Sequence, residues 1–238
     1  MTEAEWLTSA DPAPMLEFLL SEGSDRKLRL FAVACCRRIW HFLDDDRSRK
    51  AVEVAERYAD EVIDESERRA IRRDALEAAS QGSHESWACQ RVLCRKIADC
   101  FATPIDTSEH LGGVPDAVVH AAGLNAHFVA AKSLGWGPHV EPILHTAEEC
   151  ERNEQTISLR DIFGNSFRPV TIDPRWLTSN VVDLANAIYS ERAFDRMPIL
   201  SDALMDAGCD SEEVLNHCRS EGPHVRGCWV VDLLTGRE

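Results

Sequence analysis

The sequence has no apolar run of the roughly 18 residues needed to cross a membrane as a helix. Its longest apolar run, LFAVACC at positions 30–36, ends at Arg37 and Arg38. The first residues, MTEAEWLTSADPAP, carry acidic side chains and no basic segment, so they do not resemble a secretory signal. These absences favour the cytoplasm as the location of the chain.

Positive charge is scarce as well. The chain has 26 Lys and Arg against 41 Asp and Glu, which gives a formal net charge of −15. Nucleic acids and anionic membranes are bound by clustered Lys and Arg. The one dense basic stretch, RRAIRR at positions 68–73, is flanked by acidic residues, a pattern typical of a solvated helix face. We therefore expect neither a nucleic-acid partner nor a membrane partner.

Familiar catalytic motifs are missing from the sequence. GxSxG, HExxH, GxGxxG and the phosphate-binding loop do not occur. His110, His120 and His127 could in principle transfer protons, but no nucleophile motif accompanies them. We interpret them as surface or interface histidines, so the sequence favours a non-enzymatic protein.

The pattern that is present is helical. Leu28, Phe31, Cys35 and Ile39 fall at helical spacing and predict one buried face of a helix that begins near Asp25. Near the C-terminus we expect helices at about 179–192, 197–207, 211–218 and 224–234, the last begun by Pro223. No alternation of apolar and polar residues is long enough to demand a sheet. The predicted fold class is all-α, an irregular bundle of helical hairpins with about nine or ten helices and little or no strand.

Gly and Pro cluster around positions 104–140, which suggests a division of the chain there. We expect an N-terminal helical subdomain over 1–104, a connecting helix and loops over 105–140, and an acidic C-terminal helical subdomain over 141–238. The net charge is −4 over residues 1–104 and −11 over residues 105–238.

Nine cysteines are present, but their number is odd and their spacing irregular. In a reducing compartment such residues act mostly as small buried apolar side chains. Cys35 and Cys36 are adjacent, and a disulfide between neighbours on a helix is strained. We expect reduced thiols and no disulfide framework.

The sharpest candidate site is HCRSEGPHVRGC at positions 217–228. His217, Cys218, His224 and Cys228 are residue types that bind zinc. Adjacent helix residues diverge by about 100°, however, so His217 and Cys218 do not easily face one ion, and the specific CxxC spacing is absent. We favour a metal-free corner between two helices, with no cofactor, and keep a zinc site as the alternative.

Two long blocks carry a resemblance. One is DRKLRLFAVACCRRIWHFL with SRKAVEVAERYAD, and the other runs from LRDIFGNSFRPVTIDPRWLTSNVV through AIYSERAFDRMPILSDALMDAGC to HCRSEGPHVRGCWVVDLL. They resemble a family of uncharacterised proteins of planctomycete bacteria. The resemblance implies a bacterial cytoplasmic protein of unknown function, and it brings no activity, cofactor or catalytic residue.

Three functions follow from these observations. The leading hypothesis is a non-enzymatic helical protein-interaction module of the bacterial cytoplasm, because catalytic motifs are missing and the surface is acidic. The alternative is a zinc-binding domain that uses the C-terminal Cys and His residues. An enzyme with an unrecognised site comes third. The sequence identifies no partner and no oligomeric state.

Overall fold

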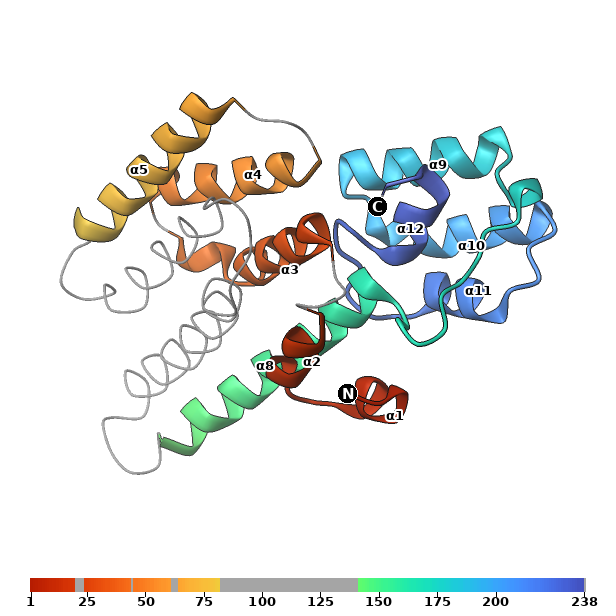
Figure 1. The fold of residues 1–238 in the computed structure, drawn as a ribbon, viewed down its shortest axis with the longest axis horizontal. Coiled ribbons are helices and arrows are strands. Elements are labelled where there is room, and N and C mark those ends of the chain that lie inside the picture. The colour runs from red at the N-terminus through yellow and green to blue at the C-terminus, as the bar shows by residue number, and fades with distance from the viewer. Residues whose placement is uncertain (20–23, 44, 61–63, 82–140, 238) are drawn as a thin grey trace. The chain divides into compact units, whose positions relative to one another are not determined.

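The computed structural model describes residues 1–19, 24–43, 45–60, 64–81 and 141–237 (Figure 1). Within these ranges the regular elements are ten α-helices and three short 3-10 helices, and no strand is present. The predicted all-α fold class is therefore confirmed. No helix in the described ranges has both the length and the apolar character to cross a membrane.

The chain divides into two compact units. The N-terminal unit comprises Met1 and Thr8–Thr156, and the C-terminal unit comprises Thr2–Leu7 and Ile157–Glu238. The predicted connecting segment 105–140 lies outside the described residues, so our division at that segment stays a prediction. His110, His120 and His127 also lie outside them.

The N-terminal unit is organised around helix α3. Its elements are α2 (Pro12–Leu19), α3 (Asp25–Arg38), η1 (Trp40–Phe42), α4 (Asp46–Asp60), α5 (Glu65–Gln81) and the part of α8 (Glu141–Phe163) that ends at Thr156. Along the chain α3 packs on α4, and α4 packs on α5.

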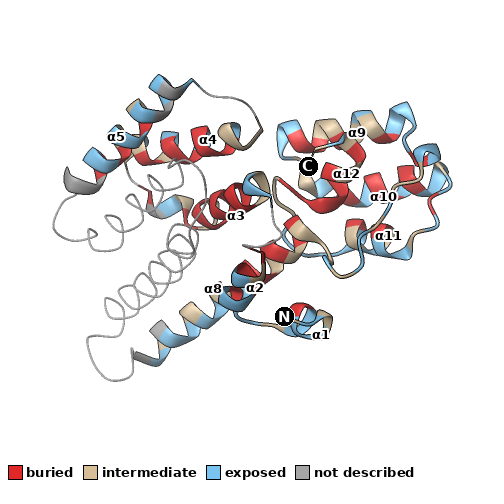
Figure 2. Cartoon of the chain, viewed as in Figure 1, coloured by how far each residue is buried: buried red, intermediate tan, exposed pale blue. Residues whose placement is uncertain are grey.

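Helix α3 is buried on more than one side. The predicted face is confirmed, because Leu28, Phe31, Cys35 and Ile39 are at most 2% exposed. Every other residue from position 28 to 36 is buried too, as the nearly continuous red of α3 in Figure 2 shows. An amphipathic surface helix would bury one stripe only. Helix α3 is therefore the central helix of this unit.

The C-terminal unit contains α1 (Glu3–Thr8) up to Leu7, the last turns of α8, η2 (Pro174–Trp176), α9 (Ser179–Glu191), η3 (Phe194–Arg196), α10 (Met197–Asp206), α11 (Glu212–Arg219) and α12 (Trp229–Thr235). Thr178 caps α9 and Ser211 caps α11, each hydroxyl accepting from a backbone N–H in the first turn of its helix. The apolar faces of α9, α10, α11 and α12 form one core. This core holds Cys209, Cys218 and Cys228 as free thiols.

Helix α1 was not predicted, although the sequence contains its signal. Thr2 and Glu5 have capping-box spacing, and each side chain accepts a hydrogen bond from the other's backbone N–H, at 3.3 and 2.7 Å. The helix places Trp6 at 0% exposure. The Trp6 indole Nε1 donates to the carbonyl of Gly164 at 3.0 Å, and Arg160 Nε donates to the carbonyl of Trp6 at 2.9 Å. The N-terminal helix is thereby attached to the end of α8.

The predicted start of the last helix is wrong. We expected it to begin at Pro223, but α12 begins at Trp229, and Cys228 is its N-cap residue. Gly227 has a φ of 96°, a left-handed conformation that a right-handed helix cannot contain. His224 and Cys228 therefore do not share a helix face, and the segment between them is an irregular connection.

Helix α8 ends at Gly164, whose φ is 64°. We expect Gly164→Ala to lower the free energy of unfolding of the C-terminal unit by about 2–5 kcal/mol. The left-handed conformation costs a residue with a Cβ about 1–2 kcal/mol. The added Cβ would also lie 3.1 Å from Cγ of Trp229, and overpacking of this kind costs about 1–3 kcal/mol more. Urea denaturation measures the loss.

Gly236→Ala is the matched control for this substitution. Gly236 has a similar φ of 68°, but no atom lies within 4 Å of a Cβ built on it. Gly236→Ala should therefore lose only the unfolding free energy that comes from placing a residue with a Cβ in the left-handed conformation. Equal losses in the two variants would show that the ring of Trp229 moves away from position 164 without cost.

Candidate metal centre

Four side chains with metal-binding atoms meet in the C-terminal unit. Asp161 lies on α8, His217 lies on α11, and His224 and Cys228 lie on the connection between α11 and α12. One potential ligand atom from each lies within 4.8 Å of the others. The side chains of Asp161, His217 and His224 are only 4%, 17% and 5% exposed, and Cys228 is fully buried.

The cluster includes three of the four residues that the sequence suggested. Cys218 is not among them, because it lies in the apolar core, where burial raises the pKa of its thiol to about 12. His217 and Cys218 are adjacent on α11 and so project in different directions. The fourth potential ligand is Asp161, which the sequence analysis did not identify.

Asp161 is the centre of the hydrogen-bonded network. Its Oδ1 lies 2.6 Å from Nδ1 of His224 and 3.2 Å from Nε2 of His217. Its Oδ2 accepts from the backbone N–H of Val225 at 2.8 Å. Burial alone would raise the pKa of this carboxyl group, but the hydrogen bonds from the two histidines outweigh burial and lower it. Asp161 is therefore a buried, ionised carboxylate that accepts hydrogen bonds from three groups.

The indole of Trp229 determines the tautomer of His217. Its Nε1 donates to Nδ1 of His217 at 3.1 Å. A neutral imidazole has one N–H and one acceptor nitrogen, so the proton of His217 is on Nε2. This N–H points to Asp161 Oδ1 and to Cys228 Sγ, which lies 3.1 Å away.

The arrangement differs from a Cys–His–Asp catalytic triad. In a triad the nucleophile and the carboxylate contact different nitrogens of the histidine. Here Cys228 and Asp161 both contact Nε2 of His217. Burial, and then the negative charge of Asp161, also raise the pKa of the Cys228 thiol well above its ordinary value. A buried thiol in this state is not an activated nucleophile.

The donor set suits zinc. Zinc is bound by Cys sulfur, His nitrogen and Asp oxygen at bond lengths of about 2.0–2.3 Å, which places tetrahedral ligand atoms roughly 3.2–3.8 Å apart. The separations of His217 Nε2 from Asp161 Oδ1 and from Cys228 Sγ, 3.2 and 3.1 Å, are near this range. The 2.6 Å between Asp161 and His224 is a hydrogen-bond length. Zinc binding would require these two groups to separate by several tenths of an ångström.

In comparisons with known proteins, no family model, no curated protein and no solved structure matches this chain. The resemblance to planctomycete proteins therefore stays a prediction. What can be said of function rests on the geometry of the site.

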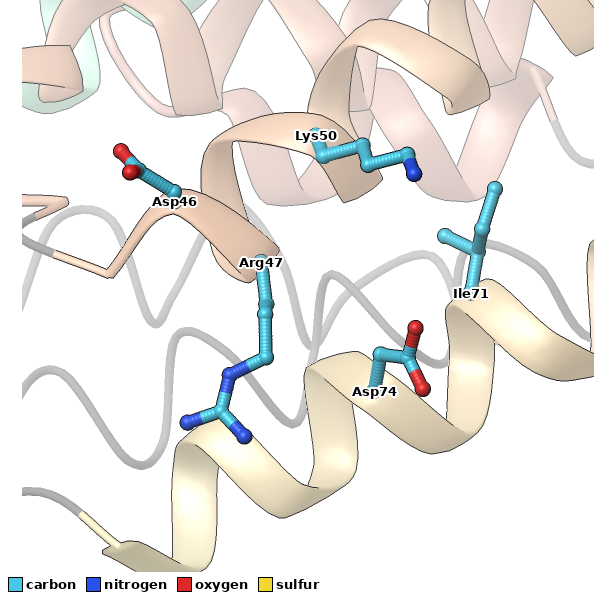
Figure 3. Close-up of a pocket in the computed structure, with 5 residues that line it drawn as sticks. All are labelled: Asp46, Arg47, Lys50, Ile71 and Asp74. Atoms are coloured by element: carbon cyan, nitrogen blue, oxygen red, sulfur yellow. The ribbon is translucent and has the colours of Figure 1, made fainter.

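Figure 3 shows a second candidate in the N-terminal unit, a pocket between α4 and α5. It has a volume of about 180 Å³ and is lined by Asp46, Arg47, Lys50, Ile71 and Asp74. Small-molecule sites usually measure about 300–1,000 Å³. Two acidic and two basic side chains line it, so the pocket has no dominant charge. It gives no indication of a ligand class.

Proposed function

We propose that this chain is a non-catalytic helical module whose C-terminal unit is stabilised by one zinc ion. The ligands would be Asp161 Oδ1, His217 Nε2, His224 Nδ1 and Cys228 Sγ. One observation carries the proposal: these four atoms, from segments up to 67 positions apart in the sequence, lie within 4.8 Å of one another in a largely buried place.

The mixture of donor atoms favours zinc over other common ions. Calcium and magnesium prefer oxygen ligands, and this set has one oxygen, two nitrogens and one sulfur. Four protein ligands complete a tetrahedral shell and leave no open position, as in structural rather than catalytic zinc sites. The proposed ion would therefore hold α8, α11 and the start of α12 together.

We further propose that the module works through protein contacts in the bacterial cytoplasm. The net charge of −15 argues against nucleic acid and anionic membrane as partners. The described cysteines are free thiols, which suits a reducing compartment.

Metal analysis and melting test the zinc proposal together. Protein purified without chelator should contain about one zinc ion per chain, and a chelator should lower its melting temperature. In Cys228→Ser we expect the bound zinc to be lost and the effect of the chelator to disappear, because a hydroxyl is a poor replacement for a thiolate ligand.

Cys218→Ser is the matched control. Cys218 and Cys228 are both 0% exposed and belong to the same core, but only Cys228 belongs to the cluster. Cys218→Ser should lose stability and still bind zinc. Purified protein that takes up no zinc, even when zinc is added, and that melts identically with and without chelator would overturn the proposal.

A further inference from the structure

The ring of Trp229 lies directly beside the proposed ligands. Its centroid is 5.0 Å from that of the His217 ring, and its Nε1 donates to His217 Nδ1 at 3.1 Å. Only 7% of the residue is exposed, and a Cβ at Gly164 would be 3.1–3.4 Å from three of its ring atoms. The indole is therefore closely packed in the position from which it donates.

An indole N–H can only donate a hydrogen bond. As long as it donates to Nδ1 of His217, the imidazole proton must lie on Nε2, the atom that faces Asp161 and Cys228. A nitrogen that carries a proton has no lone pair for a metal. If Nε2 binds zinc, the proton moves to Nδ1, and two N–H groups then face each other 3.1 Å apart.

We propose that Trp229 opposes zinc binding at this site, because its hydrogen bond holds His217 in the tautomer that cannot be a ligand. The inference rests on the proposed zinc function and adds its regulation. Zinc and the Trp229–His217 hydrogen bond exclude each other. Binding of the ion therefore requires the hydrogen bond from Trp229 Nε1 to His217 Nδ1 to break.

Among the two proposed histidine ligands, this conflict is confined to His217. When Nδ1 of His224 binds the ion, its proton moves to Nε2, which lies 3.4 Å from Ser220 Oγ. That hydroxyl donates to the carbonyl of His217 at 2.8 Å and can still accept. In known zinc sites the second nitrogen of a ligating histidine usually donates to an acceptor. Ser220 can serve His224 in this way, whereas Trp229 cannot serve His217.

The test is Trp229→Phe, which removes the indole N–H and keeps an aromatic ring beside Gly164. The matched control is Trp176→Phe, the same substitution at another buried tryptophan of the same unit, 6% exposed. We would measure the zinc affinity of each purified chain by competition with a chromophoric chelator. Trp229→Phe should bind zinc about threefold to tenfold more tightly than wild type, as expected from removing one competing hydrogen bond. Trp176→Phe should not bind more tightly than wild type.

If Trp229 had only a structural role, Trp229→Phe would bind zinc more weakly than wild type, because a damaged core weakens binding. Zinc binding by wild type with no gain in Trp229→Phe would overturn this inference and leave the zinc proposal standing. Absence of zinc binding in wild type and in both variants would overturn the zinc proposal, and this inference with it.

Nuclear magnetic resonance of the wild-type chain gives a second readout, which holds even if Trp229→Phe folds poorly. The indole N–H signals are assigned in the wild-type chain itself, from the nuclear Overhauser contacts of each indole with its neighbours. Saturating zinc should shift the Trp229 signal upfield, since its hydrogen bond is lost, and should leave the Trp176 signal in place. An unmoved Trp229 signal in zinc-loaded protein contradicts the proposal.

Discussion

Replacing Asp161 by Asn is expected to lower the free energy of unfolding of the C-terminal unit by about 3–5 kcal/mol, even without metal. The carboxylate accepts hydrogen bonds from His217, His224 and the backbone of Val225. An amide offers one acceptor oxygen and turns an NH₂ group towards N–H donors. Buried donors are then left without an acceptor, and each costs about 1–3 kcal/mol.

Urea denaturation in the presence of chelator measures this loss, and hydrogen exchange of α9–α12 assigns it to the C-terminal unit. Asp202→Asn on the exposed side of α10 is the control and should cost less than about 0.5 kcal/mol. Because the pKa of Asp161 is lowered in the folded chain, its stabilising effect is present above about pH 4. It is lost as the pH falls through the lower, folded-state pKa. Equal stability of the two variants at neutral pH would show that the three donors find other acceptors.

Phe31→Ala should lower the free energy of unfolding of the N-terminal unit by about 3–5 kcal/mol. Phe31 is 0% exposed on α3, the central helix, whose other residues from position 28 to 36 are also buried. The surroundings therefore offer little freedom to fill the cavity that the lost ring leaves. Urea denaturation measures the loss of unfolding free energy. Hydrogen exchange in α3 and α4 shows whether the N-terminal unit is the part that is destabilised.

Leu76→Ala on α5 is the control for Phe31→Ala. Leu76 is 38% exposed, so removing its side chain takes little apolar surface out of the core. A loss below about 1 kcal/mol in Phe31→Ala would mean that α3 is not the centre of the N-terminal unit.

Helical periodicity and caps allowed most of the described fold to be predicted from the sequence. The spacing of Leu28, Phe31, Cys35 and Ile39 is a local property, and the structure confirms the face that it predicts. The start of α12 was misplaced because proline favours the first helical position, which suggested a helix that begins at Pro223. Only the structure shows that Gly227 has a positive φ.

The candidate site was only partly predictable, because one of its members is distant in sequence. His217, His224 and Cys228 fall within one short stretch, and their residue types drew attention to it. Asp161 lies 56 positions before His217 on another helix, and no spacing rule links the two. The 100° turn per helix residue already counted against His217 and Cys218 as joint ligands, and Cys218 indeed lies in the core.

During translation, Trp6 leaves the ribosome long before its partner is made. Gly164 follows 158 positions later, which corresponds to roughly 8–30 seconds of synthesis at about 5–20 residues per second. The whole of Thr8–Thr156 emerges in that interval and can begin to fold first. The C-terminal unit must then bind a segment that was synthesised long before it, and until it does, an indole that is fully buried in the folded protein is exposed to solvent and to chaperones.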